Sequence, residues 1–367
     1  MPEVSSNKIE FLKEGINYLF MLPLIELTSR TGIAFNKPLS AGLLINTDCN
    51  LNCPFCFIEK NTRDYKKLTE QEIYGMIDEL AEWGVMQFTV SGGEPLLDPL
   101  IFKVLSYAKS RGMITGFTTN GTLLNSRNIE EIRKAKVDRV SISIDGPEEH
   151  HDRLRGKGVY GKVIKNLELI KKLAPEIKLR INTVVFDHNI DHLVEMFEFS
   201  RKYGAQFNIM PFTFEMMTLI KQRPLKVDEV KRLMVKKESL ERLDSTLDEL
   251  KMLKRKHGVL IAPDHFIDLM KQYYRHPEYV DRTCKKGAYH LAVSSDGTVG
   301  FCGYIGSIGN IRDTPLRELW SSKEFVKARR RMYGCKKCML NCNYTPPLLD
   351  LVKDFLVYPM GRALHMC

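Results

Sequence analysis

The chain has 367 residues, which is long enough for one large domain and a smaller one. Of these residues, 44% are hydrophobic and 27% are charged, a composition typical of a soluble globular protein. Its net charge of +10 favours an acidic partner, such as an acidic ligand, a nucleic acid or an anionic membrane surface. The alternative is a solvated basic surface that binds no partner. Nine cysteines are too few for a secreted disulfide framework, and no signal-peptide pattern is present, so we expect a reducing cytoplasm.

Residues 1–40 predict a helical extension, because apolar residues recur there at helical spacing. These residues are Ile9, Leu12, Ile16, Leu19 and Phe20. The longest apolar run, over residues 18–25, contains Pro23 and is too short to span a bilayer. The helix either packs on the main domain or lies at the surface, where its apolar side chains would contact lipid or a partner.

From residue 41 onwards, short apolar or β-branched runs alternate with helical patterns. The runs predict strands at residues 42–46, 86–90, 114–119, 139–144, 178–185 and 206–210. The intervening patterns predict helices at residues 69–83, 99–111, 127–134, 161–173 and 190–203. This alternation indicates an α/β fold of parallel units, a partial (β/α)6 TIM-like barrel over residues 41–212. Functional residues in such folds cluster where the strands end.

Cys49, Cys53 and Cys56 follow the first predicted strand and so fall at the mouth of the barrel. A 4Fe–4S cluster is held by thiolates, one per iron, so three cysteines leave one iron open for a ligand. Zinc is the alternative, although a structural zinc site takes four ligands. The C-x3-C-x2-C spacing, with Phe55 just before the last cysteine, resembles the signature of the radical S-adenosylmethionine (SAM) enzymes. In that family the open iron chelates the amino and carboxylate groups of SAM.

Gly92, Gly93 and Glu94 come directly after the second predicted strand. Paired glycines let the backbone approach a ligand closely and leave its NH and CO groups able to bind that ligand. Glu94 adds a carboxylate. The tripeptide resembles the Gly-Gly-Glu element of the same family, which contacts the amino group of SAM.

Further polar residues follow the third and fourth strands, and short polar side chains there suit ribose and carboxylate hydrogen bonds. The resemblance assigns Asn120, Ser143 and Asp145 to the SAM pocket. Arg155 either pairs with the methionine carboxylate of SAM or is a plain surface residue.

The alternation of strands and helices ends before residues 213–283. This segment contains charged helical stretches at residues 227–236 and 238–257, which predict a helical connector. A second module, residues 284–367, begins at Cys284. Its turn sequence around Gly297 predicts a hairpin between residues 291–293 and 299–301, which would bring Cys284 and Cys302 near one another. This element resembles the auxiliary-cluster domain called SPASM, or its shorter form, Twitch.

The cysteines of this module are Cys284, Cys302, Cys335, Cys338 and Cys342. Full SPASM domains carry enough cysteines for two clusters, whereas five favour a single auxiliary 4Fe–4S cluster. We expect Cys284, Cys302, Cys335 and Cys338 to hold it, with Cys342 able to replace one of them. Cys367 would be a spare thiol, and zinc is the alternative metal because four thiolates suit it equally well.

The resemblance also implies the chemistry. The reduced first cluster would cleave SAM to methionine and a 5′-deoxyadenosyl radical, which abstracts hydrogen from an unactivated substrate carbon. It implies an electron donor such as flavodoxin or ferredoxin. The auxiliary cluster would take an electron back from the substrate in a net oxidation.

Family membership alone makes maturation of a peptide or protein the leading hypothesis for the function. The alternative is biosynthesis of a cofactor, lipid or sugar precursor, for which the apolar N-terminal stretch and residues 347–360 would form a membrane-proximal surface. The third hypothesis is a non-catalytic metal-binding module that binds nucleic acid, although no nucleic-acid motif is present.

Overall fold

The structure is a computed structural model, and it describes residues 20–58, 66–213, 227–276, 283–300, 302, 305–336 and 338–339. The predictions for residues 1–19, 347–360, Cys342 and Cys367 lie outside these ranges. Of the helices in the described ranges, none is long and apolar enough to cross a membrane.

The strands form one curved sheet in the order β6-β5-β4-β3-β2-β1-β7-β8-β9. Seven strands run parallel: β1 (Ser40–Leu44), β2 (Gln87–Ser91), β3 (Ile114–Thr119), β4 (Arg139–Ser143), β5 (Lys178–Val185), β6 (Gln206–Pro211) and β7 (His290–Val293). The short strands β8 (Thr298–Gly300) and β9 (Gly309–Asn310) are antiparallel. The predicted open α/β barrel is therefore confirmed, with strand limits within two residues of the predicted ones.

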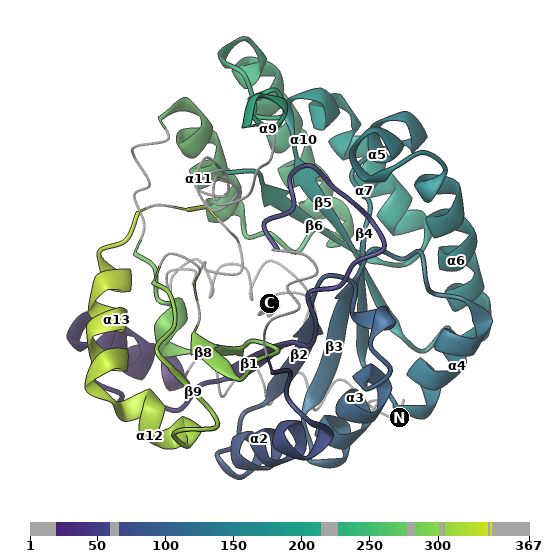
Figure 1. The fold of residues 1–367 in the computed structure, drawn as a ribbon. Coiled ribbons are helices and arrows are strands. Elements are labelled where there is room, and N and C mark those ends of the chain that lie inside the picture. The colour runs from purple at the N-terminus through teal and green to yellow at the C-terminus, as the bar shows by residue number, and fades with distance from the viewer. Residues whose placement is uncertain are drawn as a thin grey trace, which may run out of the picture.

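Helices lie along the outer side of the sheet (Figure 1). In chain order they are α2 (Glu70–Glu82), α3 (Ile101–Ser110), α4 (Ser126–Lys134), α5 (Glu148–Arg155), α6 (Val159–Leu173) and α7 (Leu193–Lys202). After β6 come α9 (Val227–Lys231) and α10 (Leu240–His257), where helical stretches were predicted, and α11 (Asp264–Arg275), which lies within the predicted helical connector. The last two are α12 (Leu316–Ser321) and α13 (Lys323–Tyr333). Helix α5, which carries Arg155, was not predicted from the sequence.

The two faces of the sheet differ in chemistry. Alternate residues of a strand point to opposite faces, and paired residues of neighbouring strands share a face. One face is apolar and joins the helices in the main core; it includes Leu43, Phe88, Phe117, Ile142, Ile181, Phe207 and Leu291. The opposite, inner face is largely polar; it includes Ser40, Gln87, Thr89, Thr118, Arg139, Ser141, Ser143, Arg180, Asn182, Gln206, Asn208 and His290. The sequence predicted the strands, but this contrast depends on their register.

The C-terminal hairpin continues the barrel sheet. The predicted hairpin is present as β7 and β8, with Gly297 at φ +87° in the turn between them. Strand β7 also pairs in parallel with β1, with Ser40 opposite His290. This pairing makes the barrel and the hairpin one hydrogen-bonded sheet. The domain limits at residues 40, 212 and 283 stay predictions.

Side chains from the C-terminal region reinforce this junction. Arg312 pairs with Glu72 of α2 and donates to the backbone oxygens of Lys66 and Lys67. The hydrogen bond from Arg312 lowers the pKa of Glu72 to about 2, against an ordinary value of 4.5. Farther along, Arg329 is buried and donates to backbone oxygens of Gly32, Gly287 and Trp320.

The N-terminal helix covers residues 20–31 and has two different sides. Ile25 is fully buried beside Leu39 and Tyr289, so this side packs on the protein. Phe20 is 77% exposed, and Leu24 and Leu27 are also exposed. The described part of this helix thus combines both sequence-based alternatives, and contact of its exposed side with a membrane stays a prediction.

Candidate active site

The three N-terminal cysteines lie on one loop that leaves the end of β1. Cys53 is buried, and Cys49 and Cys56 are half-buried. The loop turns tightly, because the backbone NH of Cys56 donates to the oxygen of Cys53 at 3.2 Å. The NH of Leu51 points at the sulfur of Cys49 at 3.5 Å. The thiols are therefore presented from one short, folded segment.

Gly92 and Gly93 pack against the backbone that leads into this loop. A Cβ atom on Gly93 would lie 2.1 Å from the backbone oxygen of Asp48, and one on Gly92 would lie 2.5 Å from Oδ1 of Asn46. The NH of Gly93 donates to the oxygen of Asn46 at 3.0 Å, and the NH of Glu94 donates to that of Asp48 at 2.6 Å. From the sequence, the NH groups of this element were expected to bind a ligand. Instead, these two bind the cysteine loop, which explains why only glycine fits.

The Glu94 carboxylate is fully buried and already holds protein donors. It accepts hydrogen bonds from Oγ1 of Thr119 at 2.7 Å, the NH of Asn120 at 2.8 Å and the NH of Leu96 at 3.2 Å. Burial raises the pKa of this carboxyl, although the three hydrogen bonds and the nearby Arg155 oppose the shift. Glu94 thus joins the ends of β2 and β3.

Asn120 ties the end of β3 to the cysteine loop. Its Nδ2 donates to Oδ1 of Asn50 at 2.9 Å and lies 4.0 Å from the sulfur of Cys49. Its Oδ1 accepts hydrogen bonds from the NH and hydroxyl of Thr122, and that hydroxyl accepts one from Asn50. Asn50 and Thr122 were missed in the sequence, where their only signal was a place beside predicted site residues.

Asp145 and Arg155 form a buried ion pair against the same loop. The Nε of Arg155 lies 2.6 Å from Oδ2 of Asp145, and the other carboxylate oxygen accepts the NH of Val184 at 3.0 Å. Only 9% of the Arg155 side chain is exposed, so the alternative that it is a surface residue was wrong. Its guanidinium lies 5.5 Å from the centre of the Phe55 ring.

The pKa of Arg155 reflects the charged groups around it. Burial by itself lowers the pKa of this guanidinium, but Asp145, Cys53 and Cys56 outweigh burial and raise it. The side chain therefore stays a cation beside two of the three thiols. Ser143, the remaining predicted residue, lies on the inner face at the end of β4, opposite Asn182 of β5.

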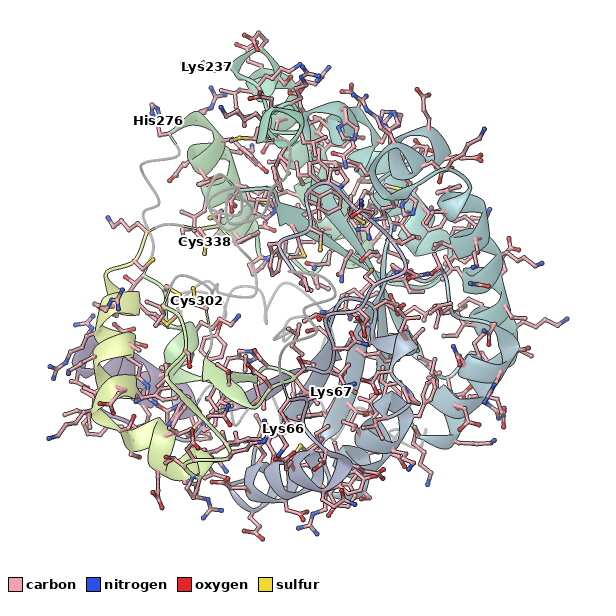
Figure 2. The ribbon with its side chains drawn as sticks, viewed as in Figure 1. Lys66, Lys67, Lys237, His276, Cys302 and Cys338 are labelled. Atoms are coloured by element: carbon pink, nitrogen blue, oxygen red, sulfur yellow. The ribbon has the colours of Figure 1, made fainter. Side chains whose placement is uncertain are left out.

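The C-terminal cysteines come from segments far apart in the sequence. Cys284 precedes β7 and is buried in the main core, whereas Cys302 follows β8 and is half-buried at the edge of that core. Cys335 and Cys338 follow α13, and Cys338 is buried. Cys302 and Cys338 lie in the same part of the view, between α11 and β8 (Figure 2).

The donor chemistry of the first loop fits an iron-sulfur cluster. Three thiols on one loop beside a buried cation suit an anionic, thiolate-bound group, because the cation stabilises the thiolate form. Within the described ranges, no group of three or more Cys, His, Asp or Glu side chains stands at the spacing of ligands to a single ion. Such spacing is not needed in a cluster, where each thiolate binds a different iron.

Comparison with known proteins identifies two domain families. The model of the radical SAM superfamily matches residues 43–200, and that of the SPASM iron-sulfur cluster-binding domain matches residues 284–343. The chain is 29% identical over 326 residues to the AdoMet-dependent heme synthase of Methanosarcina barkeri, with 84% of this chain and 89% of that protein covered. It is 32% identical over 163 residues to the PqqA peptide cyclase of Granulibacter bethesdensis, with 43% and 42% covered.

A solved structure shows the same fold. Streptococcus suis SuiB bound to S-adenosylmethionine superposes with a TM-score of 0.63 at 16% identity, covering 91% of this chain and 78% of that one. The first of these families is named for SAM and the second for binding an iron-sulfur cluster. The chain belongs to the radical SAM superfamily and is a radical SAM enzyme with a C-terminal SPASM domain.

Proposed function

We propose that Cys49, Cys53 and Cys56 hold the SAM-binding 4Fe–4S cluster and that SAM lies between this loop and the ends of β2, β3 and β4. The observation that carries the proposal is Arg155, a buried cation that is held by Asp145 and lies 5.5 Å from the ring of Phe55 on the cysteine loop. A carboxylate of SAM beside the cluster would meet this guanidinium, which binds carboxylates in a fixed fork geometry.

Glu94 can take the amino group of SAM without losing its present bonds. A carboxylate offers about four acceptor positions, and three are in use. The remaining position suits an ammonium group, whose charge would also stabilise the ionised form of this buried carboxyl. Phe55, Asn120 and Ser143 complete the predicted pocket, with Asn120 acting mainly through the cysteine loop that it holds.

When bound, the cluster and SAM supply the 5′-deoxyadenosyl radical that removes a hydrogen atom from the substrate. The protein's own part is to hold the loop, orient SAM through Arg155 and Glu94, and keep water from the reacting atoms. An acidic electron donor such as flavodoxin or ferredoxin would suit the basic surface.

The C-terminal cysteines would hold one auxiliary 4Fe–4S cluster. We assign Cys284, Cys302, Cys335 and Cys338 to it, with Cys342 as the substitute ligand. A second redox centre gives the substrate radical an electron acceptor, so the overall reaction would be an oxidation.

For the substrate, we place a cofactor precursor ahead of a peptide, reversing the order that family membership alone suggested. Three relatives matched along most of both chains are named heme synthases, and a fourth is named an Fe-coproporphyrin III synthase. A peptide substrate remains the second candidate, supported by relatives named as peptide cyclase or maturase, whose matches cover less than half of this chain. The matches to the heme synthases weigh more because they cover 78–84% of this chain.

The proposal is tested by anaerobic reconstitution, followed by iron and zinc analysis and a 5′-deoxyadenosine assay with SAM and dithionite. Wild type should bind about eight irons per chain, from two four-iron clusters. Cys53→Ala should lose about half of this iron and all SAM cleavage. The double variant Cys335→Ala/Cys338→Ala is the matched control. Because Cys342 can replace only one of the two lost ligands, this variant should lose the other half of the iron and still cleave SAM. Zinc in place of iron, or cleavage that survives in Cys53→Ala, would contradict the assignment.

A further inference from the structure

The N-terminal helix presents an apolar stripe at the surface of the protein. Phe20, Leu24 and Leu27 are exposed and recur at helical spacing, so they lie on one side of the helix. Ile33 and Phe35, just after the helix, are exposed as well. These five residues, here called the apolar patch, are five of the nine large apolar side chains that are exposed in the described ranges. Single exposed apolar residues are ordinary, whereas a cluster of them indicates an interaction site.

Two hydrogen bonds hold the parts of the apolar patch together. The hydroxyl of Thr31 donates to the backbone oxygen of Leu27, one turn earlier, and accepts the NH of Ile33 at 3.1 Å. The hydroxyl of Thr28 accepts the NH of Phe35 at 3.0 Å. The chain therefore folds back after the helix, and Ile33 and Phe35 stay beside the end of the stripe.

Helix α13 brings cations to the apolar patch. Figure 1 shows it beside the purple N-terminal helix, and the Nε of Arg330 donates to the backbone oxygen of Thr31 at 2.7 Å. The buried Arg329 fastens the two helices together, because its Nη1 donates to the backbone oxygen of Gly32 at 3.1 Å. The solvent side of α13 is basic. It carries four exposed cations and one exposed anion: Lys323, Lys327, Arg330, Arg331 and Glu324.

The acidic residue of the N-terminal helix does not offset these cations. Glu26 is the only Asp or Glu within residues 20–31, and it already pairs with Arg30 and with Lys285, each at 2.6 Å. Two cations thus share one carboxylate. Together with the exposed side of α13, they leave a net positive charge beside the apolar patch.

We propose that the apolar patch and the basic side of α13 bind the surface of an anionic lipid membrane. Such a surface presents negative head groups directly above apolar acyl chains, so it matches the cations and the patch at once. In a symmetric pair of this chain, by contrast, the basic sides would lie near one another, and like charges would oppose the contact. The inference goes beyond the proposed function and does not depend on it.

The test measures vesicle binding without turnover. The full-length holoenzyme is mixed with vesicles of equal parts phosphatidylglycerol and phosphatidylcholine, or of phosphatidylcholine alone, and bound protein is separated by flotation. Binding to the anionic vesicles should be at least about tenfold tighter, because each cation near such a surface contributes about fivefold. Added salt should weaken this binding, since it screens the charges.

Two double variants remove the two halves of the surface separately. Leu24→Ser/Leu27→Ser should weaken binding to anionic vesicles by about tenfold or more, because two apolar side chains are lost from the acyl boundary. Lys327→Gln/Arg331→Gln should weaken it by about tenfold or more and should make it less sensitive to salt. All four side chains are exposed, so neither variant disturbs the core.

Matched controls lie on other helices. Met252→Ser removes an exposed apolar side chain from α10, and Lys162→Gln/Lys165→Gln removes two exposed cations from α6. Both should bind vesicles as the wild type does. Thermal unfolding and iron content are measured for each variant to confirm that it is folded.

Four results would overturn the proposal. Equal binding to the two vesicle types would show that anionic head groups are not recognised. Unchanged binding in Leu24→Ser/Leu27→Ser would mean that another part of the chain binds lipid. Equal weakening by the charge variants of α13 and α6 would mean that only net charge matters. A wild-type dimer that dissociates in the leucine variant, measured by light scattering, would make the patch a contact between two copies.

Failure of this proposal is distinguishable from failure of the proposed function. Vesicle binding is measured without SAM or reductant, so its loss says nothing about the cysteine loop. The leucine variant should still cleave SAM with dithionite at the wild-type rate, because its substitutions lie on the outer side of the N-terminal helix. Absence of SAM cleavage in the wild type would instead refute the proposed function.

Discussion

The two cysteine groups of this protein are built in different ways. Cys49, Cys53 and Cys56 occupy one loop, which hydrogen bonds fasten to the ends of β2 and β3. The C-terminal cysteines are spread from Cys284 to beyond α13 and depend on β7, α12 and α13 for their positions. The first group is thus a local motif held by tertiary contacts, and the second is a set of ligands that only the fold can assemble.

The largest expected effect tests how the first group is held. Gly93→Ala places a Cβ 2.1 Å from the Asp48 backbone, so the cysteine loop must move. Because misplacement of a reacting group by about 1 Å can cost a hundredfold in rate, SAM cleavage should fall by about a hundredfold or more. About four irons per chain should remain in the C-terminal region. The deoxyadenosine assay and iron analysis measure both effects.

Gly75→Ala is the matched control for this change. Gly75 lies within α2, and no atom stands within 4 Å of its added Cβ. The substitution should leave SAM cleavage unchanged and stabilise the protein by about 0.5–1 kcal/mol, because alanine is the better helix former. Equal activity of the two alanine variants would show that the close backbone approach at Gly93 does not position the cysteines.

The next effect concerns the ion pair beside the first group. Asp145→Asn keeps the side-chain shape but leaves the buried Arg155 cation without its carboxylate. Breaking a buried pair in this way should lower the free energy of unfolding by about 3 kcal/mol, and the KM for SAM should rise. Urea unfolding and SAM kinetics test the prediction. Asp228→Asn, at a highly exposed position on α9, should change neither, and a similar result for both variants would speak against the role of the pair.

The smallest effect concerns the junction that supports the second group. Arg312 lowers the pKa of Glu72 to about 2, so the ionised carboxylate stabilises the fold at pH values above its ordinary pKa of 4.5. This contribution is lost as the pH falls from about 4.5 towards 2. Because both side chains are partly exposed, we expect Arg312→Gln to cost only about 1 kcal/mol at pH 7.

Urea unfolding at pH 7 and pH 3 tests this junction. The difference between wild type and Arg312→Gln should be clear at pH 7 and should shrink at pH 3, because Glu72 becomes protonated more readily in the variant and in the unfolded chain. An equal difference at the two pH values would mean that Arg312 acts through its bonds to the backbone oxygens of Lys66 and Lys67.

Much of the fold was predictable because its signals are local. The alternating apolar runs predicted β3 and β5 at their observed limits, and Thr69 was correctly placed at the start of α2, where its hydroxyl accepts the NH of Glu72. Helix α5 was missed because its residues are mostly charged or histidine. It therefore lacks the apolar periodicity that marks the other helices. With it, the burial of Arg155 was missed.

The cysteine spacing, the glycine pair after β2 and the strand-helix alternation were determined by the sequence itself, since each pattern spans only a few residues. Tertiary structure decided the rest. The pairing of β1 with β7 joins segments some 250 residues apart, and the Asp145–Arg155 pair needs the turn of α5. Which face of the sheet receives Arg180 depends on strand register, because a shift of one residue reverses every side chain. Hydrogen bonds between distant segments set that register, and no local pattern records them.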